Sequence, residues 1–159
     1  MRKRLLDDID RRIIAHLQQE GRRPFTTIAR DVGLSEAGVR QRVARLVRNR
    51  VIQIVAASSP LGLGFMQAEV GLRIAGDRLM EVANELVGYP EVDFVAVSAG
   101  SFDLIIGLVC RDQEELLEII TRRIRTLPGV EHAEIFVYLK LLKDSYQWSP
   151  IGLGEKEGT

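Results

Sequence analysis

The chain has 159 residues, of which 46% are hydrophobic and 28% charged, and its formal net charge is zero. This composition is typical of a globular protein with one ordinary domain or two small ones. No apolar run reaches the length of about 18 residues that a membrane span requires. The start of the chain, MRKRLLDDIDRR, has acids where a secretory signal has an apolar core. We therefore expect a cytoplasmic protein, and the single Cys110 fits a reducing compartment.

The zero net charge conceals opposite charges in the two parts of the chain. Residues 1–50 contain 13 Lys and Arg against 6 Asp and Glu, whereas residues 51–159 contain 9 against 16. All but one of the 13 cations are Arg, whose guanidinium bonds phosphate and guanine through two N–H groups. This asymmetry predicts a basic nucleic-acid-binding module joined to an acidic one.

Three helices are predicted in the basic part. The first covers Leu6–Gln19, with acids in its first turn and apolar residues at helical spacing. The second runs over about Thr26–Val32, and the third follows Ser35 and reaches Leu46. Gly33 supplies the left-handed residue that ends the second helix, and Ser35 caps the third. The pattern predicts a helix-turn-helix.

A helix-turn-helix with a basic outer face is the geometry that enters the major groove of DNA. The N-terminal part of its second helix contacts base edges, and later arginines contact phosphates. The predicted contacts with double-stranded DNA are Ser35, Glu36, Ala37, Gly38, Arg40, Gln41, Arg42 and Arg45. Arg2, Lys3 and Arg4 form either an arm on the phosphate backbone or a basic tail.

Two of these residues have an alternative role. Glu36 either accepts a hydrogen bond from a cytosine amino group or interacts favourably with the helix dipole. Arg42 either contacts DNA or pairs with Asp31 or an acid of the first helix. For the helix pair as a whole, the alternative is a helical hairpin with a solvated cationic face.

A β-branched run follows the three helices. Residues 51–57, VIQIVAA, predict a short strand pair that packs on the helices as a wing. The turn-rich sequence SSPLGLG comes next. We place a helix-turn-helix domain with a short wing at residues 1–55 and a linker at residues 56–65.

The following residues, 66–142, predict elements in the order β-α-β-β-α-β. Four strands are expected, over Phe65–Ile74, Val92–Ala99, Phe102–Cys110 and Val130 to about Leu142. Two helices begin after the predicted caps Asp77 and Asp112. This order is that of the ferredoxin-like fold, a four-stranded antiparallel sheet with both helices on one face. The fold class is therefore α+β, with an N-terminal winged helix-turn-helix domain and a C-terminal ferredoxin-like βαββαβ domain.

The predicted strands are apolar on both sides. Ile105, Val109, Phe136, Tyr138 and Leu142 lie opposite the sets Ile106/Leu108 and Val137/Leu139, and the helices leave one of the two faces uncovered. An apolar face of that size is seldom left in water, so we predict a homodimer through the second domain. The C-terminal tail covers residues 143–159, and its aromatic part, with Tyr146 and Trp148, is expected to dock on the partner subunit, whereas about the last five residues are expected to be disordered.

Several short segments occur together in a specific order and spacing. They are Leu6-Asp7-Asp8-Ile9-Asp10, Gly21-Arg22, Val32-Gly33-Leu34-Ser35, Val51-Ile52, Gly100-Ser101-Phe102-Asp103 and Leu127-Pro128-Gly129-Val130. Along nearly its whole length the chain thus resembles the Lrp/AsnC (leucine-responsive, or feast/famine) transcription regulators. The resemblance implies sequence-specific DNA binding, dimers that often form octamers, and an amino acid or related metabolite as effector.

The resemblance also implies an effector site at Ala99, Gly100, Ser101, Phe102 and Asp103, with contributions from Glu69, Glu134 and Tyr138 of neighbouring subunits. Gly100 would let backbone N–H groups approach a carboxylate, and Asp103 would hold an α-ammonium group. The alternative is a simple hairpin whose Asp103 bonds to its own turn. The chain departs from the family pattern at Ala99, where Thr is frequent, and at Arg50, where Gly is usual.

No catalytic residue, metal or cofactor is expected. His16 and His132 have no Cys or His partner at ligand spacing, and no phosphate-loop or nucleophile motif occurs. The enzyme alternative is a siroheme-decarboxylase-like protein of the same architecture, which Arg23-Pro24-Phe25 resembles, although the strand over residues 93–99 lacks His, Tyr and Arg. The other alternative is a sensing or scaffold protein without DNA binding, against which the Arg-rich third helix argues.

Overall fold

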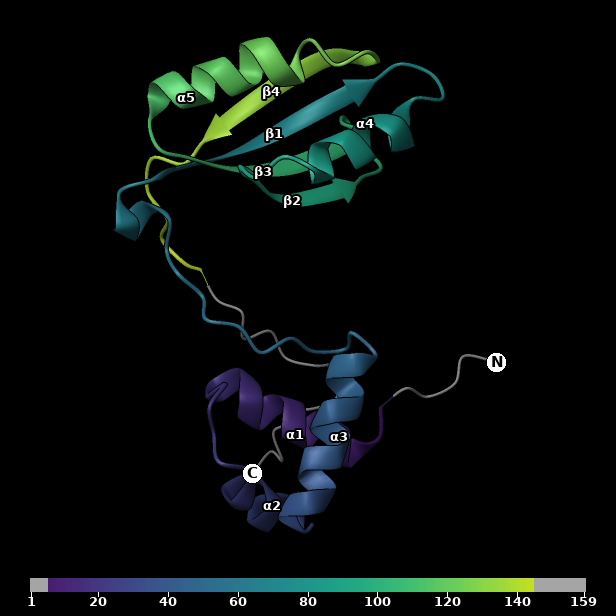
Figure 1. Cartoon of the computed structure of the whole chain (residues 1–159), viewed down its shortest axis with the longest axis vertical. Coiled ribbons are helices and arrows are strands. Elements are labelled where there is room, and N and C mark those ends of the chain that lie inside the picture. The colour runs from purple at the N-terminus through teal and green to yellow at the C-terminus, as the bar shows by residue number, and fades with distance from the viewer. Residues whose placement is uncertain (1–5, 145–159) are drawn as a thin grey trace, which may run out of the picture. The chain divides into compact units, whose positions relative to one another are not determined.

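The computed structural model describes residues 6–144. The predicted basic arm at Arg2, Lys3 and Arg4 and the tail aromatics Tyr146 and Trp148 lie outside these residues. The chain divides near residue 56 into two compact units, of which the second extends to Leu142 (Figure 1). None of the helices in residues 6–144 is long and apolar enough to cross a membrane.

The first unit consists of three helices, α1 (Asp8–Gln19), α2 (Phe25–Val32) and α3 (Glu36–Arg48). The Asp7 side chain caps α1 by accepting the backbone N–H of Asp10. Gly33 ends α2 with a left-handed φ of 75°, and Ser35 caps α3 by accepting the N–H of Gly38. The predicted helix-turn-helix is confirmed, together with its two turn residues.

One small core holds the three helices together. Ile13 of α1, Ile28 of α2 and Val39 of α3 are fully buried in it. Each comes from the apolar stripe of its own helix, so burial of three stripes fixes the angles between the helices. Ile52, beyond α3, packs against the same core.

The predicted wing is wrong. Residues 51–57 contain no strand, and Ile54 and Val55 are 49% and 73% exposed. A strand requires a neighbouring backbone with which to exchange hydrogen bonds, and the described part of this unit is otherwise helical. The segment instead runs as extended chain into a short 3-10 helix, η1 (Leu61–Leu63).

The second unit is a sheet with two helical segments. Its elements are β1 (Met66–Ile74), α4 (Leu79–Val87), β2 (Val92–Val97), β3 (Leu104–Cys110), α5 (Gln113–Glu118), the π-helical continuation η2 (Ile119–Ile124) and β4 (Val130–Val137). The strand order is β2-β3-β1-β4, and every neighbouring pair is antiparallel (Figure 1). The predicted ferredoxin-like topology is confirmed.

Alternation along the strands separates a helix-covered face from an open face. Val70 of β1 and Ile106 of β3 face each other and are fully buried under α4 and α5. Their neighbours Glu69 and Gly107 are likewise paired and point to the open face. That face carries Phe94 and Phe136, which are 50% and 45% exposed.

The last strand is shorter than predicted. β4 ends at Val137, which pairs with Ala68, and the N–H of Tyr138 makes a further bond to the carbonyl of Gln67. Beyond that point only Met66 remains in β1, it has no partner in β4, and Leu139 is 95% exposed. The sequence favoured a longer strand because apolar residues continue to Leu142, beyond the residues that pair with β1.

Candidate nucleic-acid interface and effector loop

One side of α3 is free of the core. Ala37, Gln41, Ala44 and Arg48 are spaced by four, three and four residues, so they form one stripe along the helix. All four are exposed, and the core residues of α3 lie on its other side. Arg48 is absent from the contacts predicted above, although its spacing from Ala44 places it on this stripe.

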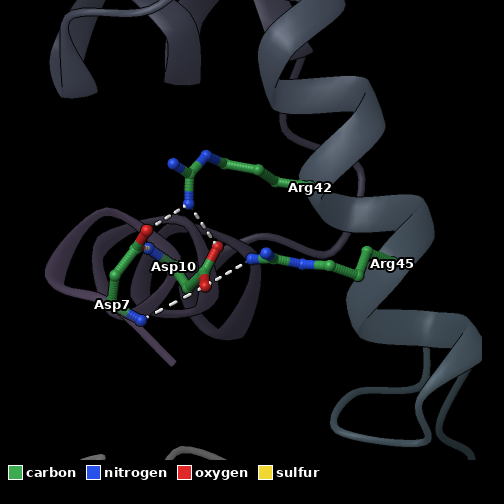
Figure 2. Close-up of polar contacts among 4 residues, drawn as sticks. All are labelled: Asp7, Asp10, Arg42 and Arg45. Atoms are coloured by element: carbon green, nitrogen blue, oxygen red, sulfur yellow. Dashed lines mark hydrogen bonds and ion pairs between the residues drawn. The ribbon is translucent and has the colours of Figure 1, made fainter. Parts of the chain in front are cut away.

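Two predicted DNA contacts, Arg42 and Arg45, are bonded to acids of the first helix (Figure 2). The Arg42 guanidinium lies 2.6 Å from Asp7 Oδ2 and 2.8 Å from Asp10 Oδ1, and Arg45 lies 2.5 Å from Asp10 Oδ2. Asp10 is 1% exposed, whereas the side chains of Arg42 and Arg45 are 26% and 43% exposed. The structural alternative for Arg42, pairing with the first helix, is confirmed.

The same contacts set the electrostatics of this cluster. The hydrogen bond from Arg42, reinforced by the backbone N–H of Asp10, holds the pKa of Asp7 below its usual value. The bonds to Asp7 and Asp10 raise the pKa of Arg42. Both partners therefore remain charged at neutral pH, and the pair fixes α3 against α1.

Arg40, on the flank of α3, is also held within the protein. Its guanidinium bonds to Glu36, four residues earlier, and lies 5.3 Å from the centre of the Phe25 ring. Glu36 is the first residue of α3, where its negative charge interacts favourably with the helix dipole. A contact between Glu36 and a cytosine amino group would compete with the ion pair to Arg40. The i, i+4 spacing of Glu36 and Arg40 could have predicted that ion pair from the sequence.

The C-terminal end of α3 contains an unusual backbone conformation. The N–H of Arg50 bonds to the carbonyl of Val47, and that of Val51 bonds to the carbonyl of Leu46. This pair of bonds is a Schellman motif, which requires a left-handed residue. Arg50 takes that conformation, with φ 55°, while Asn49 has φ −84°.

The predicted effector loop lies between β2 and β3. Asp103 is tied to β1, because its carboxylate accepts the N–H of Ile74 at 2.8 Å and its own N–H donates to Leu72. Ser98 bonds to the carbonyl of Phe102 at 2.6 Å. Asp103 thus has a structural role, but its bond runs to β1 rather than to its own turn.

The other loop residues divide into an exposed and a packed group. Ala99, Gly100 and Ser101 are exposed, and a Cβ on Gly100 would meet no atom within 4 Å. Phe102 instead lies across Gly71 of β1, where a Cβ would come within 2.5 Å of its ring. Its ring also meets Phe136 edge-on, with centroids 6.3 Å apart. The first three residues are available to a ligand, whereas Phe102 covers the open face of the sheet.

Of the three residues expected to contribute from neighbouring subunits, two meet within one chain. Tyr138 is hydrogen-bonded to Glu69, which raises the pKa of Tyr138 to about 12. Glu134 pairs with Gly71 on β1 and is exposed. Among residues 6–144 no group of three His, Cys, Asp or Glu side chains is arranged to hold a metal ion.

Family models match both units. Residues 6–47 match the AsnC-type helix-turn-helix domain, and residues 65–150 match the PF0864 C-terminal dimeric alpha+beta barrel domain. The chain belongs to the Lrp/AsnC family of transcriptional regulators. The family resemblance of the sequence is thereby confirmed.

Related Lrp/AsnC proteins match almost end to end. The HTH-type transcriptional regulator FL11 of Pyrococcus furiosus is 32% identical over 143 residues, covering 89% of this chain and 94% of FL11. Ptr1 of Methanocaldococcus jannaschii is 32% identical over 142 residues, covering 88% of this chain and 96% of Ptr1.

Solved structures share the fold. AsnC of E. coli has a TM-score of 0.80 at 20% identity, covering 91% of this chain and 99% of AsnC. A transcriptional regulator of Neisseria meningitidis, solved as a complex with L-Met, has a TM-score of 0.79 at 23% identity, covering 92% of this chain and 97% of that one.

Proposed function

We propose that this regulator binds an operator in double-stranded DNA by placing α3 in the major groove. The observation that carries the proposal is the exposed stripe of α3, which includes Arg48, is flanked by Arg45 and belongs to a helix-turn-helix. Arg45 donates one hydrogen bond to Asp10, and its other N–H groups remain available because a guanidinium has five donors. Phosphate contacts from such arginines orient a recognition helix in the groove.

The second unit supports assembly into a homodimer through its open sheet face. Phe94 and Phe136 are half-exposed there, and Phe102 adds its ring to the same face. A second copy of this face would remove these rings from water. Two helix-turn-helix units in a dimer then bind half-sites about one helical turn, roughly 34 Å, apart or a multiple of that distance. Octamers, as implied by the family resemblance, are assemblies of such dimers.

A gel-shift experiment with the full chain tests DNA binding. The DNA upstream of its own gene and a pool of genomic fragments serve as probes, with unrelated DNA as competitor. We expect a specific band that weakens steeply with salt, since phosphate contacts release counterions. Absence of any specific, salt-sensitive band on every fragment would overturn the proposed function.

We further propose an amino acid or related small metabolite as the effector, bound at residues 99–103. Support comes from the exposed Ala99, Gly100 and Ser101, and from the carboxylate of Asp103, of which only Oδ2 is hydrogen-bonded within residues 6–144. The L-Met complex of the Neisseria meningitidis regulator shows that one protein of this fold takes an amino acid. Such a ligand presents a carboxylate to backbone N–H groups and an ammonium group to Asp103.

A thermal-shift screen of amino acids and keto acids tests the effector proposal. A ligand at 100 times its dissociation constant stabilises the folded state by about 2.7 kcal/mol. Gly100→Ala should reduce that shift while leaving the melting temperature of the free protein unchanged, because the added methyl meets no atom of the chain. A ligand whose shift is the same in both proteins binds elsewhere.

We also propose that this regulator is not an enzyme and that it acts in the cytoplasm. Its relatives FL11 and Ptr1 are named transcriptional regulators, which does not favour the siroheme-decarboxylase alternative. The exposed stripe of α3 likewise argues against a scaffold without DNA binding. An absorbance assay with a haem-like tetrapyrrole separates the enzyme alternative, and we expect no decarboxylation.

A further inference from the structure

We infer that Gln41 is the specificity-determining residue of α3 and that it selects adenine in each half-site. This inference rests on the proposed binding of α3 in the major groove. It concerns which base the helix prefers, and not whether the helix binds DNA.

The arginines near the N-terminal half of α3 are engaged within the protein. Arg40 is bonded to Glu36, and Arg42 is bonded to Asp7 and Asp10. Arg45 is bonded to the buried Asp10. An arginine recognises guanine by directing two N–H groups at O6 and N7, and the ion pair of each of these side chains limits the directions in which its remaining N–H groups can point.

Gln41 has no such restraint. It is exposed on the outward stripe, and its side chain makes no hydrogen bond to any residue in 6–144. The residues one turn away on either side are Ala37 and Arg45, so neither neighbour is an acid that could hold it. Its amide is therefore free to meet a base edge.

The chemistry of the stripe matches an A·T pair. A glutamine amide accepts a hydrogen bond from N6 of adenine and donates one to N7, which makes a bidentate contact. Ala37 and Ala44, on the same stripe, offer methyl groups that suit the methyl group of thymine. Arg48 lies near the C-terminal end of α3, where a recognition helix contacts phosphates rather than bases.

Selection from a library of randomised duplexes, using the full-length protein, tests the inference. The wild-type protein should enrich adenine at one fixed position per half-site. Replacing that base in the selected duplex should weaken binding about 5- to 150-fold, which corresponds to 1–3 kcal/mol for a bidentate base contact.

Three variants make the test specific. Gln41→Ala should lose the preference at that position only. Gln41→Arg should shift the preference there from adenine to guanine, because position 41 has no acid one turn away. The control Arg48→Ala, on the same stripe, should weaken binding to all duplexes and leave every base preference intact. Unchanged melting temperatures establish that all three fold.

The outcomes separate the inference from the proposed function. Specific enrichment by the wild-type protein whose base preferences survive in Gln41→Ala would overturn the role of Gln41 and leave DNA binding standing. A wild-type selection with no adenine preference under α3 would also overturn it. A wild-type protein that enriches no sequence would overturn the proposed function and the inference together.

Discussion

Asp10 is the residue on which the position of α3 depends most. It is a buried carboxylate that joins two guanidinium groups of α3 to α1, and its partners are both partly exposed. Removing one partner of a buried ion pair leaves the remaining charges without compensation. The helix that we propose to bind DNA is thus held by an acid that is itself buried.

Asp10→Ala should lower the free energy of unfolding by about 3 kcal/mol, because both arginines lose a charged hydrogen-bond partner. Denaturant unfolding measures the change. Asp8→Ala is the matched control: its carboxylate lies on the same helix and bonds to Arg11, but it is 93% exposed. An exposed pair of this kind contributes less than about 1 kcal/mol. Equal losses in the two variants would contradict the role of Asp10.

Asp7 gives the same cluster a dependence on pH. Its pKa is lower in the folded protein than the value of about 3.9 in an unfolded chain. The folded state therefore binds fewer protons, and the stabilisation is complete above the unfolded value and lost as pH falls through the folded one. Between about pH 5 and pH 2, the wild-type free energy of unfolding should fall more steeply than that of Asp7→Asn. Parallel curves would show that the Arg42 contact does not stabilise the fold.

Sequence spacing could predict the two turn residues of the helix-turn-helix but not the pairing within this cluster. Ser35 and Gly33 act through neighbours within five residues, so the local sequence pattern was sufficient for both. The bonds from Arg42 and Arg45 to Asp10 span 32 and 35 positions. Such contacts depend on the angle between the helices, which the packing of the core sets. From the sequence alone, several acids were equally plausible partners for these two arginines.

At the scale of elements, the C-terminal end of α3 stores strain. A left-handed residue other than glycine is disfavoured by about 1 kcal/mol or more, and Arg50 occupies that position in the Schellman motif. Arg50→Gly should therefore raise the free energy of unfolding by up to about 1 kcal/mol. Asn49→Gly, at an ordinary φ of −84°, should not stabilise the protein. Denaturant unfolding compares both, and a loss of stability in Arg50→Gly would contradict the assignment.

Elements were predicted well where one chain segment determines them, and less well where they depend on a partner. The strand predicted over Phe65–Ile74 is β1, which covers Met66–Ile74. The wing at residues 51–57 and the end of β4 depended on neighbouring strands that the sequence does not reveal. Of the two predicted helix caps, one is confirmed and one is wrong. Asp112 caps α5, whereas α4 begins after Arg78 and has no capping bond to the side chain of Asp77.

For the whole molecule, the open sheet face is the proposed dimer interface. Phe136→Glu should convert dimers into monomers, because a carboxylate placed among apolar rings at a subunit interface carries a desolvation penalty. Light scattering after size-exclusion chromatography measures the assembly. Met80→Glu is the control, since Met80 is 58% exposed on α4, over the other face. A Phe136→Glu variant that folds and remains dimeric would place the interface elsewhere.

The central claim is that the outward side of α3 binds the operator. Its most direct test is the salt dependence of binding to a selected duplex, measured by fluorescence anisotropy for the wild-type protein and Arg48→Ala. We predict weaker binding by the variant on every sequence, an unchanged assembly size, and a salt slope shallower by about one unit per bound protomer. An Arg48→Ala protein with the affinity and salt slope of the wild type would contradict the placement of α3 on DNA.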